Sequence, residues 1–165
     1  MVYQLTHQDV QEIADCGHEI LARIPKFGYA CAHLSSLWGA VIRDNTHIPV
    51  NVVAGNLHMD GIPIFHNDDS PEVVASNFQK SNLAWNGHVW VTFGNVIGEI
   101  SLFRTAYSRP DGDWLRQHVT AKFGAGRGIV LGTVEGMTYA PKYNLSDEEI
   151  TQLIQPLRHY FSEAA

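Results

Sequence analysis

Cys31 is the residue whose type and position most directly indicate nucleophilic chemistry. It lies in the stretch GYACAHLSSLW, residues 28–38, at the first turn of a predicted helix. The N-terminus of a helix has unpaired N–H groups and a partial positive charge, which favour a thiolate and can hold an oxyanion. The same position also suits a small apolar residue that begins a buried helix face with Leu34 and Trp38. The position alone therefore leaves a nucleophile and a core residue as alternatives.

A thiol nucleophile needs a base, and His88 is the histidine that best suits this role. It opens a predicted strand, HVWVTFG, between Trp85 and Trp90. His33 lies only two residues after Cys31, so it points to another side of the same helix and is expected at the surface. A strand histidine that only satisfies its polar neighbours is the alternative, because the surroundings of an imidazole set its charge and tautomer.

An acid that orients His88 is expected on the next strand. The two strands are joined by a two-residue turn at Gly94-Asn95, which fits a tight hairpin. In that register His88 faces Ser101 and Trp90 faces Glu99, and a small bulge would bring Glu99 opposite His88. A carboxylate beside an imidazole orients the ring and stabilises its charged form. Glu99 or Ser101 is therefore the predicted third member of the site, and a solvent-facing Glu99 is the alternative.

The elements that must position these residues follow from apolar spacing and turn signals. Thr6 with Asp9 and Ser146 with Glu149 form capping boxes that begin two helices. Pro156 is expected to interrupt the second of these helices. Residues of about 56–87 are predicted to be a long irregular insertion, with a short helix near 71–79. The other predicted helices span 7–23, 31–44 and 113–122, and the predicted strands span 47–57, 88–94, 96–105 and 128–136.

Helices that flank the strands, without alternating with them, predict an α+β fold with a mostly antiparallel sheet. The 165 residues are expected to form a single domain. The chain has 11 basic and 17 acidic residues, for a net charge of -6, so nucleic acid is excluded as the expected partner. No apolar run reaches the roughly 20 residues of a membrane span, and the N-terminus lacks the pattern of a signal peptide. The sequence therefore predicts a cytoplasmic protein with no membrane partner.

Part of the chain, roughly residues 28–105, resembles the transglutaminase-like superfamily within the papain-like group. The similarity lies in a Cys that opens a helix, a strand of the form IP followed by five residues and Gly, an H-x-W strand, and an acid on the next strand. These features are matched in the same order by Cys31, Ile48, Pro49, Gly55, His88, Trp90 and Glu99. The family usually has Asp where this chain has Glu99, and the insertion of about 56–87 is a second difference.

The resemblance implies a papain-like fold with the catalytic Cys31 at a helix N-terminus. It also implies acyl transfer on an amide or ester of a peptide or protein, with His88 as base and Glu99 as the residue that orients it. The Cys31 amide would contribute to the oxyanion hole. Water as acceptor would make the protein a peptidase or amidase, and an amine would make it a transglutaminase-like acyltransferase. No cofactor is implied.

Two other interpretations of the sequence remain open, and a third is disfavoured. The hairpin HVWVTFGNVIGEIS also resembles that of cell-wall peptidases of the NlpC/P60 type, which would imply peptidoglycan peptides as substrates. The domain could instead be a non-catalytic module that binds a peptide or protein through the same fold. A metal site built from Cys31, His58, His66 and His88 is disfavoured, because no pair has the spacing of a zinc finger or of an H-E-x-x-H helix.

Overall fold

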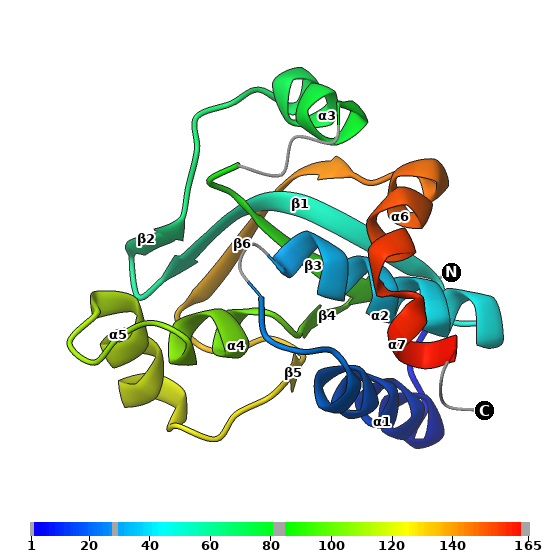
Figure 1. Cartoon of the computed structure of the whole chain (residues 1–165), viewed down its shortest axis with the longest axis horizontal. Coiled ribbons are helices and arrows are strands. Elements are labelled where there is room, and N and C mark those ends of the chain that lie inside the picture. The colour runs from blue at the N-terminus through cyan, green and yellow to red at the C-terminus, as the bar shows by residue number, and fades with distance from the viewer. Residues whose placement is uncertain (1, 28–29, 81–84, 163–165) are drawn as a thin grey trace.

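The computed structural model describes residues 2–27, 30–80 and 85–162, in which helices surround an antiparallel sheet (Figure 1). The helices are α1 (His7–Arg23), α2 (Cys31–Asn45), α3 (Pro71–Gln79), α4 (Leu102–Tyr107), α5 (Trp114–Phe123), α6 (Asp147–Ile154) and α7 (His159–Ser162), with a 3₁₀ turn η1 (Gln155–Leu157) before α7. The strands are β1 (Val50–Met59), β2 (Ile62–Phe65), β3 (His88–Phe93), β4 (Val96–Glu99), β5 (Val130–Leu131) and β6 (Met137–Asn144).

The long strand β1 organises the sheet, because it pairs with β2, β3 and β6. The main path of the sheet runs β2-β1-β3-β4-β5, and every pairing along it and between β1 and β6 is antiparallel. This confirms the predicted combination of helices with a mostly antiparallel sheet. No helix in the described part of the chain is both long and apolar enough to cross a membrane.

The core forms where α2 lies across β1 and β3, with α1 packed against α2 (Figure 1). Trp38 of α2 is fully buried, and its indole N–H donates a hydrogen bond of 2.9 Å to the carbonyl of Ile13 in α1. Gly39 permits the close approach of α2 to β1, because a Cβ at this position would lie only 2.8 Å from the Val52 side chain. These contacts fix the position of α2, and with it the position of Cys31 at its first turn.

Capping boxes and Pro156 have the predicted effects on the helices. The boxes of Thr6 with Asp9 and of Ser146 with Glu149 are both formed, and they begin α1 and α6. Helix α6 ends just before Pro156, where the chain forms the 3₁₀ turn η1 before α7 begins. Local sequence signals therefore account for these helix boundaries.

Two predicted strands are wrong over much of their length. The strand expected over 96–105 ends at Glu99, and the chain turns into α4, because the Glu99 carboxylate accepts the N–H groups of Ser101 and Leu102 at the start of that helix. The apolar run after Glu99 fits a helix as well as a strand. Of the strand expected over 128–136, only the two residues of β5 pair with the sheet.

The insertion of about 56–87 is less irregular than predicted. Strand β1 continues to Met59, β2 pairs back onto it, and α3 covers the expected 71–79. Strand β6 was not predicted, because its mixed polarity and Pro141 argue against a strand. It pairs only with β1 among the described strands, which is the edge position where a proline is tolerated.

Candidate functional site

The centre of the site is a buried pair formed by His88 and Glu99. His88 begins β3 and Glu99 ends β4, and the predicted hairpin register is observed, with Val91 opposite Gly98. The pairing stops one residue before Glu99, and its side chain reaches His88 without a bulge in this ladder. The Nε2 atom of His88 lies 2.6 Å from Oε1 of Glu99, and both side chains are only 1% exposed.

Three further donors hold the Glu99 carboxylate in place. The backbone N–H groups of Ser101 and Leu102 each donate to Oε2 at 3.2 Å, and the Tyr139 hydroxyl of β6 donates to Oε1 at 3.0 Å. Burial alone raises the pKa of Glu99, but the ion pair with His88 and these hydrogen bonds outweigh it and lower the pKa. Burial and Glu99 raise the pKa of Tyr139, so its hydroxyl remains a donor. Glu99 is thus held as a carboxylate inside the protein.

The His88–Glu99 pair favours the charged form of the imidazole. Burial alone lowers the pKa of His88, but the Glu99 carboxylate and an interaction with Cys31 outweigh it and raise the pKa well above its ordinary value. Because Nε2 faces Glu99, Nδ1 is the ring atom left for Cys31. This Nδ1 is buried and has no hydrogen bond of good geometry to any described residue. The site therefore has one ring nitrogen fixed by an acid and the other available to a thiol.

Helix α2 places Cys31 beside His88 through contacts that the next turn of the helix makes with β3. Ser35 is fully buried, and its hydroxyl donates a hydrogen bond of 3.0 Å to the carbonyl of Val89, the residue after His88. Ala32 packs in the same apolar cluster as Val89, with Cys31 partly buried at its edge. The helix is thereby held against β3 beside His88. Cys31 remains partly accessible, as a group that meets a substrate must be.

An aromatic side chain fixes the ring plane of His88. Phe65 at the end of β2 stacks on His88, with ring centroids 4.8 Å apart and planes within 7°. Trp90, which is 2% exposed, lies near both His88 and Tyr139. Gly55 of β1 makes room for these rings, because a Cβ there would lie 2.8 Å from Trp90. Stacking and hydrogen bonding together restrict His88 to one orientation.

Cys31 opens onto a cleft of about 640 Å³. Its walls come from the end of β2 and the following residue, from residues 85–87 before β3, and from α4, α5 and the segment between them. The volume is in the range of small-molecule and peptide side-chain sites. A ligand in this cleft would meet the Cys31 thiol next to the buried pair.

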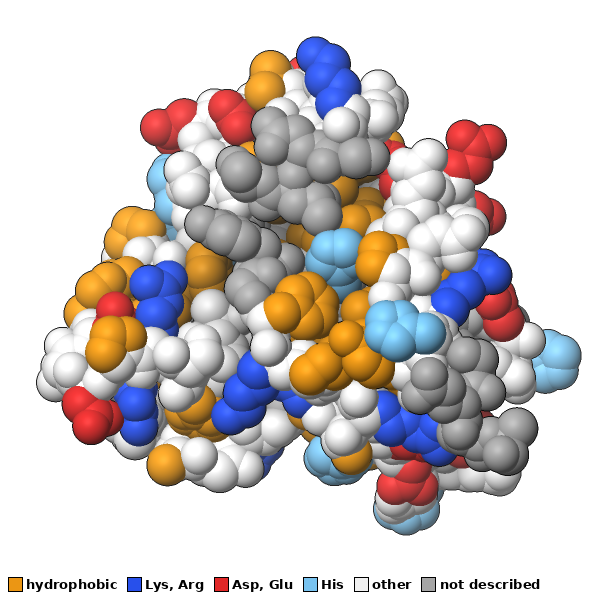
Figure 2. All heavy atoms as spheres, in the orientation of Figure 1, with side chains coloured by type: hydrophobic (Ala, Val, Ile, Leu, Met, Phe, Trp, Pro, Cys, Tyr) orange, Lys and Arg blue, Asp and Glu red, His pale blue; other side chains and the backbone are white. Residues whose placement is uncertain are grey.

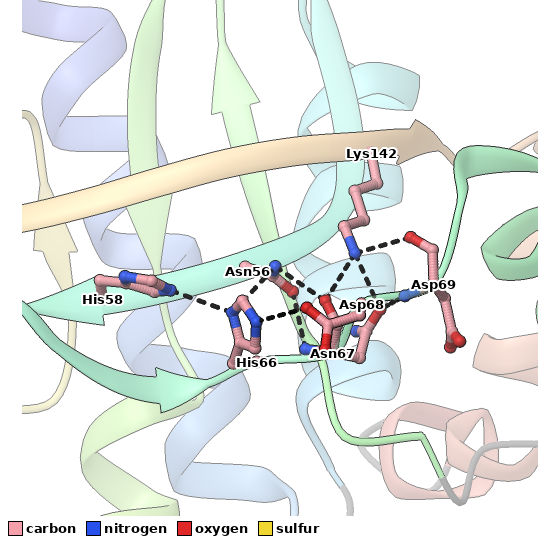
Figure 3. A network of polar contacts seen from close by, with 7 residues as sticks. All are labelled: Asn56, His58, His66, Asn67, Asp68, Asp69 and Lys142. Carbon is pink, nitrogen blue, oxygen red and sulfur yellow. Dashed lines mark hydrogen bonds and ion pairs between the residues drawn. The ribbon is translucent and has the colours of Figure 1, made fainter.

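A polar network holds the β2 wall of the cleft in place. In Figure 3, Asn56 and His58 of β1 and Lys142 of β6 converge on residues 66–69, which follow β2. Nδ1 of His66 accepts from Asn56 at 3.2 Å and lies 3.1 Å from Nε2 of His58, while its Nε2 donates to Asp68 at 3.0 Å. Both ring nitrogens of His66 therefore have partners within the protein.

Lys142 is the second part of this network. Its ammonium donates to the carbonyl and side chain of Asn67 at 2.7 and 2.9 Å and to the carbonyl of Asp69 at 2.7 Å. These hydrogen bonds tie the segment after β2 to β6. Because Phe65 immediately precedes the segment, Lys142 helps to hold the ring that stacks on His88.

The structure separates the other residues that were considered for the site. His58 and His66 contact each other, and His66 lines the same cleft as Cys31, but the described residues contain no group of three or more His, Cys, Asp or Glu that could hold a metal ion. His33 is half-buried, not at the surface as predicted, because its Nδ1 lies 2.7 Å from the carbonyl of Leu153 in α6. The Ser101 hydroxyl is buried without a hydrogen bond to the described residues, so Glu99 is the group that contacts His88.

No family model, no curated protein and no solved structure matches this chain.

Two residues of the site were missed from the sequence. Tyr139 contributes a hydrogen bond to Glu99 across 40 positions of the chain, and Phe65 stacks on a histidine that follows 23 positions later. Tyr139 lies in a stretch of mixed polarity that contains Pro141, and such a stretch gives no local signal for this contact. For Phe65 there is one local signal, because it lies in the short apolar run IPIF, which is typical of a strand.

Proposed function

We propose that this protein is a cysteine-dependent acyl-transfer enzyme with a papain-like arrangement of Cys31, His88 and Glu99. The observation that carries this proposal is the fully buried His88–Glu99 pair beside Cys31, at the N-terminus of a helix and at the wall of a cleft. A buried ion pair is costly unless its members are well hydrogen-bonded, and such perturbed pairs in clefts are typical of functional sites. A module that only binds a partner has no need of this arrangement.

In the proposed resting state, the Cys31 thiol has given its proton to Nδ1 of His88, which forms a thiolate–imidazolium pair. In the acylation step the thiolate attacks the carbonyl carbon of an amide or ester. The carbonyl π-electrons move to oxygen and form a tetrahedral oxyanion. The backbone N–H of Cys31 at the start of α2 is suited to stabilise that charge. The bond to the leaving group then breaks, the leaving group takes the proton from His88, and Cys31 remains as a thioester.

Deacylation repeats these steps with a second nucleophile. His88 accepts a proton from water or from an amine as it attacks the thioester carbon, and the tetrahedral intermediate expels the Cys31 sulfur. The sulfur recovers the proton from His88, and the acid or the new amide leaves. Glu99 holds Nε2–H throughout, so that Nδ1 is the atom that exchanges the proton. Hydrolysis and transfer differ here only in the acceptor.

The proposal is tested by thiol chemistry with Cys16 as internal reference. Burial and Glu19 raise the pKa of Cys16 to about 11, so this thiol is expected to react slowly. We expect iodoacetamide to alkylate Cys31 much faster than Cys16 at neutral pH, with rates read by peptide mass. We also expect p-nitrophenyl acetate to acetylate Cys31 and to be turned over, and His88→Asn to slow turnover by about 100-fold or more.

The outcome that contradicts the proposal is equally specific. If Cys31 reacts no faster than Cys16, or if His88→Asn leaves alkylation and acetylation unchanged while the protein remains folded, Cys31 is not an activated nucleophile. The domain would then be a binding module. Cys31→Ser controls for acetylation at other sites, and Cys16→Ser should retain full turnover.

We further propose a cytoplasmic setting for this enzyme. Both cysteines are free, and a reducing compartment keeps a nucleophilic thiol in its active form.

A further inference from the structure

The wall of the cleft opposite the β2 side carries a positive charge. Arg109, between α4 and α5, lines the cleft together with Thr105 and Ser108. Asp68 and Asp69, which follow β2, do not line the cleft. In Figure 2 the acidic side chains that are visible lie toward the edges of the face. Among the described residues that line the cleft, Arg109 is the one with a permanent charge, and its ion pair with Asp113 is long, at 3.9 Å.

The guanidinium of Arg109 keeps its hydrogen-bonding capacity. Its nearest acidic partner is Asp113, with Nη1 of Arg109 and Oδ2 of Asp113 3.9 Å apart, which is too long for a hydrogen bond. Asp113 uses its other oxygen, Oδ1, to cap α5 through the N–H of Leu115 at 2.9 Å. Within the described residues, the guanidinium thus has five N–H donors and no hydrogen-bonded acceptor. A planar guanidinium of this kind matches a carboxylate with two parallel hydrogen bonds.

The cleft also presents aromatic surfaces. Trp114 begins α5, lines the cleft and is 52% exposed, although α5 buries its neighbour Leu115. Trp85 lines the cleft from the segment before β3, and its indole N–H is buried without a hydrogen bond to the described residues. Large exposed aromatic side chains beside a charged group are a common composition of ligand sites. The cleft therefore combines one cationic group with flat apolar surfaces.

We propose that the cleft selects substrates that carry a carboxylate next to an apolar or aromatic group. Arg109 binds the carboxylate, and Trp114 contacts the apolar group while the acyl carbon lies at Cys31. The inference rests on the proposed function, since it assigns the substrate class of that site. Arg109 and Trp114 are specificity-determining residues in this proposal and take no part in proton transfer.

The charge preference is measured with reagents that share one reactive group and differ in charge. Methanethiosulfonates with a sulfonate, a hydroxyl or a trimethylammonium group all form a mixed disulfide with the Cys31 thiolate and release methanesulfinate. We expect Arg109→Gln to lower the ratio of the anionic to the neutral rate by about two- to tenfold, as expected for a unit charge several ångströms away at a partly solvated site. Arg109→Lys should retain most of the ratio. Arg158→Gln, an exposed arginine outside the cleft, should retain all of it.

The apolar part of the proposal needs a second measurement. We expect 3-phenylpropionate to protect Cys31 from iodoacetamide and 3-phenylpropionamide to protect it much less. Protection by the acid should be lost in Arg109→Gln and weakened in Trp114→Ala. Trp114→Ala should leave the anionic-to-neutral ratio unchanged, which separates contact with the apolar group from charge.

An anionic-to-neutral ratio that is the same in wild type and Arg109→Gln would overturn carboxylate recognition, and equal protection by the acid and the amide would do so too. These readouts are ratios at one thiol, so they do not depend on how strongly His88 activates Cys31. Failure of the proposed function appears instead as a neutral-reagent rate at Cys31 that is insensitive to His88→Asn. The two failures are therefore distinguishable.

Discussion

At the scale of single residues, the pair of His88 and Glu99 sets the chemistry of the site. In the proposed mechanism the protonated imidazole of His88 donates a proton to the leaving group, and the Glu99 carboxylate stabilises this protonated form. Because the folded-state pKa of His88 is raised, the stabilisation from its positive charge is complete below the ordinary value of 6.5 and is lost as the pH rises through the raised value. The pair therefore strengthens the fold at neutral pH as well as orienting the ring.

The Glu99→Gln variant tests this electrostatic account. In wild type we expect the His88 ring proton shifts, measured by NMR, to stay constant from about pH 5 to 8, because His88 remains protonated throughout. In Glu99→Gln the raising effect of the carboxylate is removed and burial lowers the pKa of His88. The His88 ring proton shifts should then change with pH, with a midpoint between about pH 5 and 8 or below pH 5.

The control for this titration is Asp68→Asn, which removes the carboxylate that contacts the exposed side of His66 and leaves His88 untouched. His88 should remain constant with pH in this variant. A wild-type His88 that titrates near 6.5 would show that Glu99 does not govern its charge.

At the scale of elements, the site depends on how closely β1, β3 and β6 approach one another. Gly55 of β1 pairs with His88 of β3, and the β6 backbone crosses beside it. A Cβ at Gly55 would lie 2.1 Å from the carbonyl oxygen of Ala140 and 2.8 Å from the Trp90 ring. A glycine is therefore required here by contact with neighbouring strands.

We accordingly expect Gly55→Ala to lower the free energy of unfolding by about 3 kcal/mol, because the added methyl group overpacks a backbone contact. Urea unfolding followed by circular dichroism measures this change. Gly126→Ala is the matched control, because a Cβ there has no atom within 4 Å, and we expect a change within about 0.5 kcal/mol. Equal effects of the two substitutions would contradict the packing argument.

At the scale of the whole molecule, the cleft is assembled from segments that are far apart in the sequence. Cys31 comes from the first half of the chain, Arg109 from the turn between α4 and α5, and the β2 wall is held by Lys142 of β6. Figure 1 shows β2 and α5 at the left of the molecule, away from α1 and α7. The shape of the cleft is thus a property of the folded chain and of the contacts that hold β2.

Removal of the Lys142 ammonium should loosen the β2 wall without unfolding the protein. We expect Lys142→Met to increase amide hydrogen exchange in residues 64–70 by roughly tenfold, the effect of losing hydrogen bonds from a charged donor. Lys122→Met is the control. The Lys122 ammonium also holds a loop, through a hydrogen bond of 3.1 Å to Asp60, but this loop lies outside residues 64–70. Unchanged exchange in residues 64–70 would show that β2 is held by other contacts.

The sequence by itself determined the features that local chemistry encodes. Capping boxes at Thr6 and Ser146 fixed two helix starts, and Gly94-Asn95 fixed the register of the β3–β4 hairpin. These signals act over a few residues, because a cap or a turn needs only its own side chains and backbone. The same local reasoning also put Cys31 at the start of a helix and the acid on the strand after His88.

Tertiary structure alone decided which groups meet. Strand β6, with Tyr139 on Glu99 and Lys142 on the segment after β2, has no local pattern that predicts it, because its partners lie on β1 and in loops. The turn of the chain into α4 after Glu99 likewise depended on a side chain that caps the helix from inside the protein. Contacts between distant parts of a chain are selected by packing of the whole core. The choice of Glu99 over Ser101 as the group that contacts His88, and the cleft beside Cys31, therefore emerge only from the fold.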